Sequence, residues 1–456
     1  MPRPKRISPK VNPLEMIRPH AAGIDISATM HHVAIPPQLG GETVTEFGAF
    51  TEDLYAMRDY LLSKGITTVA MESTGVYWIN AYNILEEAGF DVFLVDPRKI
   101  KSAPGRKSDV LDCQWIQQLH AYGLLSKAFR PAEHIVSLRT FTRLRSLCIT
   151  DQAREIQHMQ KVLTEMNIKL QHVVSDICGA TGLKIIDSIL EGERDPLKLA
   201  NLRDKRCHSD ETTIAKSLHG HYRQELIVAL RIARDRIAFI DHQIAQIDEE
   251  IRRFLERTER REPRVDNQPK TKPKPESRPG KNGLKFDGHQ LLIHMAGVDL
   301  TTIPGFNTPT ALSILSETGT NVQEFKNSGH FASWLNLAPG IKKSGGKIMS
   351  SKIKSTAGRA GKMFRMAAYS QINAKSEFGD WLRVKRAHLG VQKALVAGAH
   401  KLARIYYSVM VNRLPYDPTK PFADPEKKKE REVSYLTKRA NKLGFALTPH
   451  ATEVKI

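Results

Sequence analysis

The sequence predicts an α/β domain, then a long helical region, then a small and mostly helical C-terminal domain. Three observations lead to this prediction: short apolar runs alternate with amphipathic stretches at the start, a heptad spacing follows, and glycine-punctuated basic segments come last. The 456 residues are enough for two or three domains with their own cores. The expected segments are residues 1–132, a helical region 133–257, a proline- and lysine-rich linker 258–287, a second domain 288–412 and a polar tail 413–456.

The first segment begins with three short apolar runs that predict strands. These runs are residues 22–26, 32–35 and 43–47, and the turn between the last two contains Pro36-Pro37 and Gly40-Gly41. Thr51 is the expected N-cap of a helix that runs to about Lys64 and ends at Gly65.

The rest of the first segment alternates between strand and helix. The expected elements are a strand 66–71 that ends at Glu72, a helix 77–88 that stops at Gly89, a strand 90–95, and a helix that Ser108 would cap and that carries Trp115, Ile116 and Leu119. The order is therefore β-β-β-α-β-α-β-α. A three-strand meander followed by α/β alternation is the layout of ribonuclease H-like domains.

Four carboxylates occupy distinctive places in this layout. Asp109 and Asp112 are three residues apart in the first turn of one helix, where the helix dipole favours ionised carboxylates. Acidic residues are common in the first turn of any helix, so this pair alone is also consistent with an ordinary helix start. Asp25 lies on the first strand, however, and Glu72 lies at the carboxyl end of the fourth, where open α/β sheets bind ligands. We therefore expect the four to hold two Mg²⁺ or Mn²⁺ ions, roughly 3.5–4 Å apart, for phosphodiester chemistry.

Sugar kinases and actin-like ATPases use the same superfold, but they need glycine-rich phosphate loops. The sequence has no such loop in its first domain. This class of activity is therefore not expected.

A heptad seam runs through the second half of the helical region. The apolar positions alternate in steps of four and three, and they are Leu226, Leu230, Ala233, Ile237, Ile240, Ile244, Ile247, Ile251 and Phe254. Two interpretations remain open. The seam either joins subunits as a coiled coil, or it packs within the chain against an earlier helix that contains Ile156, Met159 and Leu163.

Charge and composition restrict the partners of the chain. The formal net charge is +20 and the pI about 9.7, a balance that indicates a polyanion such as nucleic acid. Mean hydropathy is −0.37 and no apolar run reaches membrane-spanning length, so we expect a cytoplasmic protein that does not bind membranes. The basic N-terminus lacks the apolar run of a secretory signal. The four scattered cysteines predict reduced thiols, not a zinc site.

The second domain opens with a Pro304-Gly305 turn that leads into an apolar helix. This stretch is similar to a helix-hairpin-helix element, whose helix N-terminus binds phosphate through backbone N–H groups. Asn307 stands where that motif usually has a second glycine, and asparagine tolerates left-handed geometry. A capped core helix after a Pro-Gly turn is the alternative.

A strongly basic segment follows, from Lys342 to Arg365, with eight Lys or Arg and no acid. Ser344 precedes Gly345-Gly346, so we expect it in a flexible cationic loop that a ligand can approach closely. The serine could be a nucleophile, or it could only donate a hydrogen bond to phosphate. The expected nucleic-acid-binding residues are Lys342, Lys343, Gly345, Gly346, Lys347, Lys352, Lys354, Arg359, Lys362 and Arg365.

These motifs together resemble the transposases of insertion-sequence family one-ten, over about residues 20–410. The resemblance rests on Gly23-Ile24-Asp25, Met71-Glu72-Ser73-Thr74-Gly75, Lys107 to Asp112, Ile303-Pro304-Gly305, and Ala338-Pro339 with Ser344 to Lys347. This chain departs from the family at Cys113, where alanine is commoner in the family, and in its long proline-rich linker. The first domain is thus expected to be like the RuvC Holliday-junction resolvase.

The resemblance implies a function and a division of roles. It implies an RNA-guided recombinase that cleaves and exchanges DNA strands, with Asp25, Glu72, Asp109 and Asp112 as metal ligands and Ser344 as nucleophile. It also implies donor and target DNA, a structured bridge RNA and a homo-oligomer, dimer or tetramer, in the bacterial nucleoid. Ser344 would meet the tetrad's metals, from the same or another subunit. The alternatives are a junction-resolving nuclease that uses water, and a non-catalytic nucleic-acid-binding protein.

Overall fold

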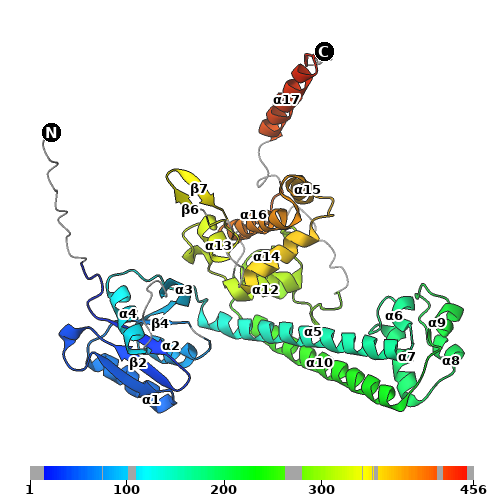
Figure 1. The fold of residues 1–456 in the computed structure, drawn as a ribbon, viewed down its shortest axis with the longest axis horizontal. Coiled ribbons are helices and arrows are strands. Elements are labelled where there is room, and N and C mark those ends of the chain that lie inside the picture. The colour runs from blue at the N-terminus through cyan, green and yellow to red at the C-terminus, as the bar shows by residue number, and fades with distance from the viewer. Residues whose placement is uncertain are drawn as a thin grey trace, which may run out of the picture. The chain divides into compact units, whose positions relative to one another are not determined.

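The computed structural model describes residues 15–73, 75–100, 109–261, 280–340, 342–351, 353, 358–418 and 425–448. It divides into two compact units, Met1–Arg130 and Pro131–Ile456. Figure 1 shows the elements of each unit. Within the described parts of the chain, no helix is both long and apolar enough to span a membrane. All four cysteines are free thiols in this structure.

Unit 1 is built on a five-stranded sheet in the order β3-β2-β1-β4-β5. Its strands are β1 (Ala21–Ile26), β2 (Met30–Ala34), β3 (Val44–Gly48), β4 (Thr68–Glu72) and β5 (Asp91–Val95). β2 pairs antiparallel with β1 and β3, whereas β4 pairs parallel with β1 and β5. The three-strand meander followed by parallel strands confirms the predicted element order.

Helices cover both faces of this sheet. The helices of unit 1 are α1 (Thr51–Ser63), α2 (Trp78–Glu87), α3 (Pro97–Ile100) and α4 (Asp109–Ala121). Leu54 of α1 and Leu85 of α2 share a core with Ile24 and Met71, whereas Ile116 of α4 packs with Ala70. Strand residues alternate between faces, so α4 lies on the face opposite α1 and α2.

One predicted cap in unit 1 is wrong. Thr51 is the first residue of α1, and Phe50 is its N-cap, with the Phe50 N–H donating to Asp53 Oδ2 at 3.1 Å. The Asp53 carboxylate therefore accepts the hydrogen bond from the backbone at the helix start, whereas we expected the Thr51 hydroxyl to cap the helix. The C-terminal end is as predicted, because Gly65 follows it with a φ of +66°. Ser108, the expected cap of α4, is outside the described residues.

Unit 2 begins with two long helices that lie side by side (Figure 1). These are α5 (Glu133–Glu165) and α10 (Gln224–Arg257), and between them in sequence come α6 (Leu170–Val173), α7 (Ala180–Glu191), α8 (Pro196–Ala200) and α9 (Glu211–Ser217). Gln152 of α5 donates to Asp241 of α10 at 2.8 Å. Ion pairs such as Arg145 with Asp248 show that the two helices run antiparallel.

The heptad seam of α10 is buried within the chain. Leu230 and Ile237 pack with Met159 and Leu163 of α5, and Ile247 and Ile251 share a core with Ile135 and Leu138 of α5. The intramolecular alternative is therefore the one that the structure shows. Leu226, Ile240 and Phe254 are only half-buried, while Ile227 and Leu255 are buried in their place.

The end of the linker is fixed to this helical pair by a buried ion pair. Arg145 Nε donates to Asp248 Oδ1 at 2.5 Å, and the two side chains are only 8% and 1% exposed. Arg145 also donates to the carbonyl oxygens of Asn282 and Gly283, and Lys285 N–H donates to Asp248. Such contacts satisfy both buried charges. Linker residues 262–279 are outside the described part of the chain.

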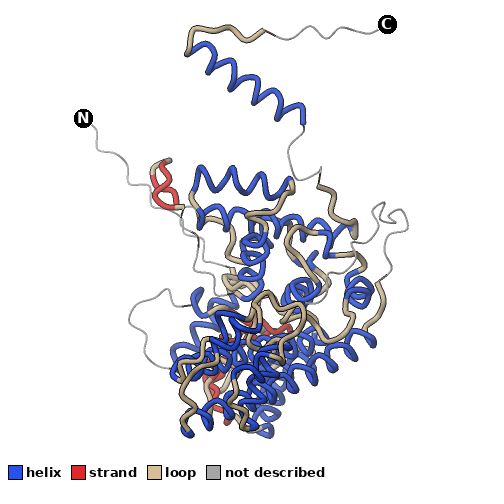
Figure 2. The backbone as a smooth tube through the Cα atoms, turned by 90° about the vertical axis from the view of Figure 1, so that its right-hand side faces the viewer, coloured by secondary structure: helices blue, strands red, loops and turns tan. Residues whose placement is uncertain are grey.

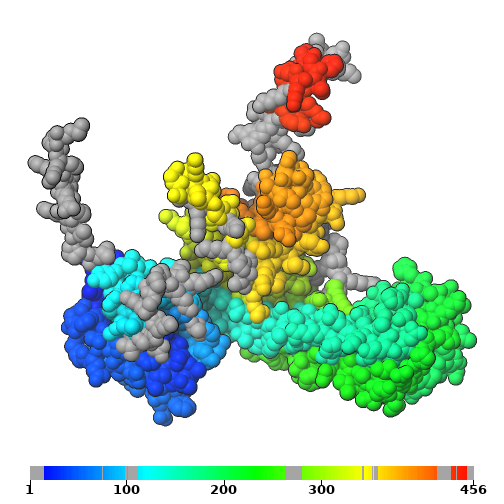
Figure 3. All heavy atoms as spheres, in the orientation of Figure 1, coloured from blue at the N-terminus to red at the C-terminus, as the bar shows by residue number. Residues whose placement is uncertain are grey.

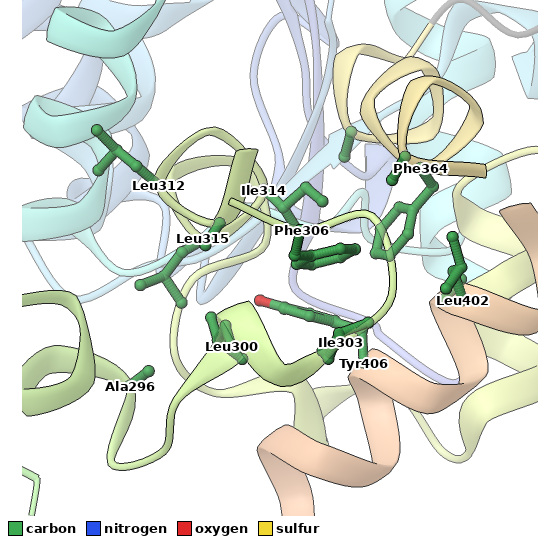
Figure 4. Close-up of a cluster of buried hydrophobic side chains, with 14 of the residues drawn as sticks. Ala296, Leu300, Ile303, Phe306, Leu312, Ile314, Leu315, Phe364, Leu402 and Tyr406 are labelled. Atoms are coloured by element: carbon green, nitrogen blue, oxygen red, sulfur yellow. The ribbon is translucent and has the colours of Figure 1, made fainter. Parts of the chain in front are cut away.

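The remainder of unit 2 is a helical domain with an aromatic core. Its helices are α11 (His289–Ala296), α12 (Thr308–Thr318), α13 (Ser328–Trp334), α14 (Arg359–Ser370), α15 (Glu377–Leu389) and α16 (Val391–Asn412). Phe306, Phe364 and Tyr406 meet at ring-centroid distances of 5.6–6.2 Å (Figure 4). The buried Tyr406 hydroxyl bonds to Thr318 Oγ1 at 2.7 Å, so its polar atom is satisfied.

Two short strands, β6 (Lys342–Ser344) and β7 (Lys347–Ser350), form an antiparallel hairpin in this otherwise helical domain. Figure 2 shows the hairpin in red beside the blue helices. The domain also contains two short 3-10 helices, Leu300–Thr302 and Val322–Glu324. Unit 1 contains a third, Pro37–Leu39. The segment that we expected to be a polar tail contains a further helix, α17 (Pro425–Lys442).

Candidate active site

Two of the four predicted carboxylates lie side by side on the sheet of unit 1. β1 and β4 are parallel neighbours whose register pairs Gly23 with Ala70 and Ile24 with Met71. The next residues along the two strands are Asp25 and Glu72, and both are half-buried. Matching positions on adjacent parallel strands point to the same face and are roughly 4.8 Å apart at Cα. Asp25 and Glu72 therefore form a pair at the carboxyl ends of these strands.

A glycine brings the third element to this pair. A Cβ on Gly23 would lie 2.3 Å from the backbone N of Gln117 and 2.4 Å from the carbonyl oxygen of Cys113, so only glycine allows α4 to pack this closely on β1. Gln117 Nε2 also donates to the Ala21 carbonyl at 3.2 Å. Gly23 and Asp25 share a face because they are two residues apart. The start of α4 is thus on the same face of the sheet as Asp25.

The thiol of Cys113 lies within electrostatic range of both Asp25 and Asp112. Burial raises the pKa of the Cys113 thiol to about 12, and the charges of Asp25 and, to a smaller extent, Asp112 contribute to the rise. A buried thiol between carboxylates stays protonated at neutral pH, so the hard oxygen ligands face no competing thiolate. From the sequence, Cys113 was expected to be a reduced thiol and a replacement for the commoner alanine, with no link to the carboxylates. Its position next to Asp112 was the available signal.

The donor set suits a hard divalent cation. Mg²⁺ and Mn²⁺ prefer carboxylate oxygens, and Asp25 of β1 and Glu72 of β4 share the face of the sheet on which α4, the helix that carries Asp112, packs. Among the side chains that the structure describes, no three His, Cys, Asp or Glu groups converge tightly enough to hold a metal ion. Asp109 begins α4, but its side chain is not among those described. The four-carboxylate metal site therefore stays a prediction.

Ser344 is on a β-hairpin, so the expected flexible loop is wrong. Ser344 ends β6 and pairs with Lys347 of β7 across a turn made by Gly345 and Gly346. These glycines have φ values of +53° and +75°, the signs that a type I′ hairpin turn requires. Nothing lies within 4 Å of a Cβ built on either one. Ser344 is thus exposed beside an open, conformationally defined hairpin turn. Figure 3 shows the hairpin in yellow, projecting from the helical domain.

The predicted nucleic-acid-binding residues fall partly outside the described chain. Lys347 is exposed on β7, and Arg359 and Lys362 are exposed at the start of α14. Arg365 is half-buried on the same helix. The side chains of Lys342 and Lys343 are not described, and Lys352 and Lys354 are outside the described residues.

The predicted left-handed geometry at Asn307 is wrong. Asn307 has a φ of −121° and caps α12, with its side chain accepting from the Thr310 N–H at 2.9 Å. Gly305 takes the left-handed conformation instead, and a Cβ there would meet the Ala367 carbonyl oxygen at 2.3 Å. The structure therefore contains a capped core helix after the Pro304-Gly305 turn, and the similarity to a helix-hairpin-helix element stays a prediction.

Sequence analysis missed a basic face on α16. Lys393, Lys401 and Arg404 recur at helical spacing, and residues 391–412 contain no Asp or Glu. That acid-free spacing was the signal. It escaped notice because the denser basic run at 342–365 dominates the second domain.

Two family models match the chain, one at each of the places described above. A model described as a transposase of the DEDD type of IS110 matches residues 22–168, which include β1, β4 and α4. A model described as Transposase IS116/IS110/IS902 family matches residues 299–382, which include the serine hairpin and α14. The chain belongs to the IS110 family of transposases. No curated protein matches this transposase.

Membership of this family makes the transposase an enzyme that acts on DNA in transposition. Both matched regions contain the residues that sequence analysis singled out. DEDD transposase domains typically depend on divalent metal ions, in agreement with the carboxylates on the sheet. The first matched region also includes all of α5, so it extends from unit 1 into unit 2.

Proposed function

We propose that this transposase cleaves and rejoins DNA through a covalent bond to Ser344, assisted by metal ions held by Asp25, Glu72, Asp109 and Asp112. The observation that supports the proposal is the pairing of Asp25 and Glu72 at the ends of β1 and β4, on the face of the sheet against which α4 packs. Unit 1 would then be a RuvC-like domain. Each of its four acids would be a ligand, not a proton donor.

The serine hairpin supports the second half of the proposal. Ser344 is exposed, and the two glycines beside it leave the hairpin tip open to a bulky ligand. Lys347 and the basic start of α14 provide positive charge for a phosphate backbone. Ile348 and Met349 are 61% and 71% exposed on β7, and exposed apolar side chains of this kind can contact unstacked bases.

The chemical step conserves phosphoester bonds. Attack of Ser344 Oγ on the scissile phosphorus would form a phosphoserine ester, as the serine loses its proton and the leaving deoxyribose oxygen gains one. Attack of a sugar hydroxyl on that ester would then restore a phosphodiester and release the serine. Because one ester replaces another in each step, rejoining needs no ATP. Bound Mg²⁺ or Mn²⁺ would supply the charge stabilisation that a neutral serine lacks.

The remaining parts of the proposal concern partners. The net charge of +20 supports binding of both DNA and a structured guide RNA, since either polyanion releases counterions on binding. We propose that the RNA selects the DNA sites and that the transposase works as a homo-oligomer in the bacterial nucleoid. Since α5 covers the seam of α10 within the chain, we propose that another surface joins the subunits.

Trapping of the covalent intermediate tests the nucleophile. Wild-type protein is incubated with a labelled DNA suicide substrate, Mg²⁺ and the RNA that copurifies with it, then separated by denaturing electrophoresis. We expect wild type to form a protein–DNA adduct and Ser344→Ala to form none. Ser350 lies on the same hairpin, so Ser350→Ala is the control and should still form the adduct. Cleavage without an adduct would show that water attacks, as in a junction-resolving nuclease. Binding without cleavage in wild type would favour a non-catalytic role.

A further inference from the structure

A groove of about 1030 Å³ runs along one side of α16. Five of the α16 residues that line it recur in steps of three or four and so lie on one face of the helix: Lys393, Ala397, Lys401, Arg404 and Ser408. Ser328 of α13, Lys326 just before that helix, and Trp381 of α15 also line the groove. The groove is therefore built by three helices of one domain.

Positive charge is concentrated in this groove. Lys326, Lys393, Lys401 and Arg404 line it, and Asp417 is the acidic residue among its lining residues. The ammonium groups of Lys401 and Lys385 are 4.9 Å and 5.8 Å from the centre of the Trp381 ring. Burial lowers the pKa of Lys401, and the charges of Arg404 and Lys385 lower it further. Cations held so close together favour the binding of an anion.

The groove begins at the base of the serine hairpin. Pro339 and Ile353 both line it, and these residues pair with each other just before β6 and just after β7. Leu337, two residues before Pro339, is also part of the lining. A polymer bound at the hairpin tip therefore has a cationic path that starts where the hairpin joins the domain.

We propose that this groove binds an unpaired segment of the DNA strand that the serine hairpin engages. The inference rests on the proposed function, since strand exchange leaves DNA locally unpaired. A row of cations along one helix face can follow the phosphates of a single strand. The apolar wall, which includes Val396 and Ile405 beside Trp381, offers contact area to unstacked bases. A concave groove of this size suits a flexible strand better than the convex surface of a duplex.

The test compares single strands with duplexes in a variant that removes two groove charges. Lys393 and Arg404 are both exposed, so Lys393→Gln/Arg404→Gln should fold normally. Lys375→Gln/Arg386→Gln is the matched control, because these cations are also exposed in the same domain but do not line the groove. Lys393→Arg/Arg404→Lys keeps the charge and should restore binding. Thermal unfolding followed by circular dichroism confirms that all three variants fold.

Binding is measured by fluorescence anisotropy over a salt series, with labelled oligothymidylate, a blunt DNA duplex and oligouridylate as probes. For the groove variant we expect affinity for oligothymidylate to fall about tenfold near physiological salt. The log–log salt slope should become shallower by about 1.4, because each of the two phosphates that the variant no longer neutralises accounts for about 0.7. Duplex affinity and the control variant should stay at wild-type values.

Four outcomes would overturn the proposal. They are an equal loss for duplex DNA, a loss confined to oligouridylate, and a loss of the same size in the control variant or none in the groove variant. The assay needs no cleavage, so it separates this inference from the proposed function. If wild-type protein never cleaves DNA but the groove variant selectively loses single-strand affinity, the groove assignment stands and the catalytic proposal fails.

Discussion

Asp25 and Glu72 occupy matching positions at the carboxyl ends of β1 and β4, one step beyond the register pair Ile24 and Met71. The two side chains share the face of the sheet on which α4 packs, because Gly23 and Ala70 precede them by two residues on that face. This arrangement gives each acid a different supporting element. It leads to the first prediction.

Asp25→Asn and Asp112→Asn should each reduce DNA cleavage by about a thousandfold or more, because a metal site contributes several kcal/mol of charge stabilisation in the transition state. Nucleic-acid affinity should be nearly unchanged, since the basic surfaces remain. Cleavage rates and filter binding measure the two effects. Glu87→Gln, at an exposed acid on α2, is the control. Cleavage at the wild-type rate in either aspartate variant would refute the assignment.

Gly23→Ala should separate α4 from β1. The new methyl group would meet backbone atoms of α4 at 2.3–2.4 Å, so the helix must shift, and overpacking of this kind costs about 3 kcal/mol. We expect a lower Tm and loss of metal-dependent cleavage. Gly280→Ala is the control, because nothing lies within 4 Å of its Cβ. Unchanged stability in Gly23→Ala would mean that α4 does not pack on β1 in this way.

The buried seam of α10 predicts an effect on stability, not on assembly. Ile247 is 9% exposed against α5, so Ile247→Asp should destabilise unit 2 by about 4 kcal/mol through a buried, unpaired charge. Phe239→Asp is the matched control, because Phe239 is 62% exposed on the same helix. Denaturant unfolding measures the loss of stability, and light scattering measures any change in oligomeric mass. A lower oligomeric mass at unchanged stability would restore the intersubunit interpretation.

The serine hairpin predicts different effects at its two glycines. Asn-Gly is a favoured type I′ pair, whereas a β-branched residue is strained at positive φ. Gly346→Val should therefore reduce adduct formation at Ser344 much further than Gly345→Asn does. Quantified adduct yields on the suicide substrate measure the difference. Similar losses in both variants would indicate that Ser344 needs a flexible loop, as the sequence alone suggested.

His120 predicts acid sensitivity in unit 1. The ring is fully buried, and its Nε2 lies 2.8 Å from Thr68 Oγ1, which itself donates to the Asp91 carbonyl; Nε2 therefore carries the proton. Nδ1 has no hydrogen-bond partner among the residues that the structure describes, and burial lowers the pKa of His120 to about 4. Between the unfolded pKa near 6.5 and this value, only the unfolded chain binds the proton, so stability falls as pH falls.

The lowered pKa of His120 corresponds to a loss of about 3 kcal/mol in the free energy of unfolding over that pH window. Urea unfolding at several pH values should show this loss in wild type and a weaker dependence in His120→Gln, whose amide can still donate to Thr68. His388, exposed on α15, provides His388→Gln as the control with a wild-type profile. An identical pH dependence in wild type and His120→Gln would contradict the assignment.

The sequence by itself determined the order of strands and helices in unit 1 and which acidic residues lie at the ends of its strands. Strand periodicity and glycine stops are local signals, so β1 to β5 and the two predicted helices α1 and α2 lie within a few residues of expectation. The places of Asp25 and Glu72 at strand ends followed directly. The Gly345-Gly346 turn was visible too, but its conformation was not, because glycine permits both a tight hairpin and a loose loop.

Only the tertiary structure decided what each surface meets. The seam of α10 has the same spacing whether its partner is α5 or another subunit, because periodicity describes one face and not its neighbour. The packing of Gly23 against α4 joins residues about 90 positions apart, and the groove beside α16 joins α13, α15 and α16. Such packing arises when the chain folds back on itself and buries apolar area, a long-range effect that no local pattern records.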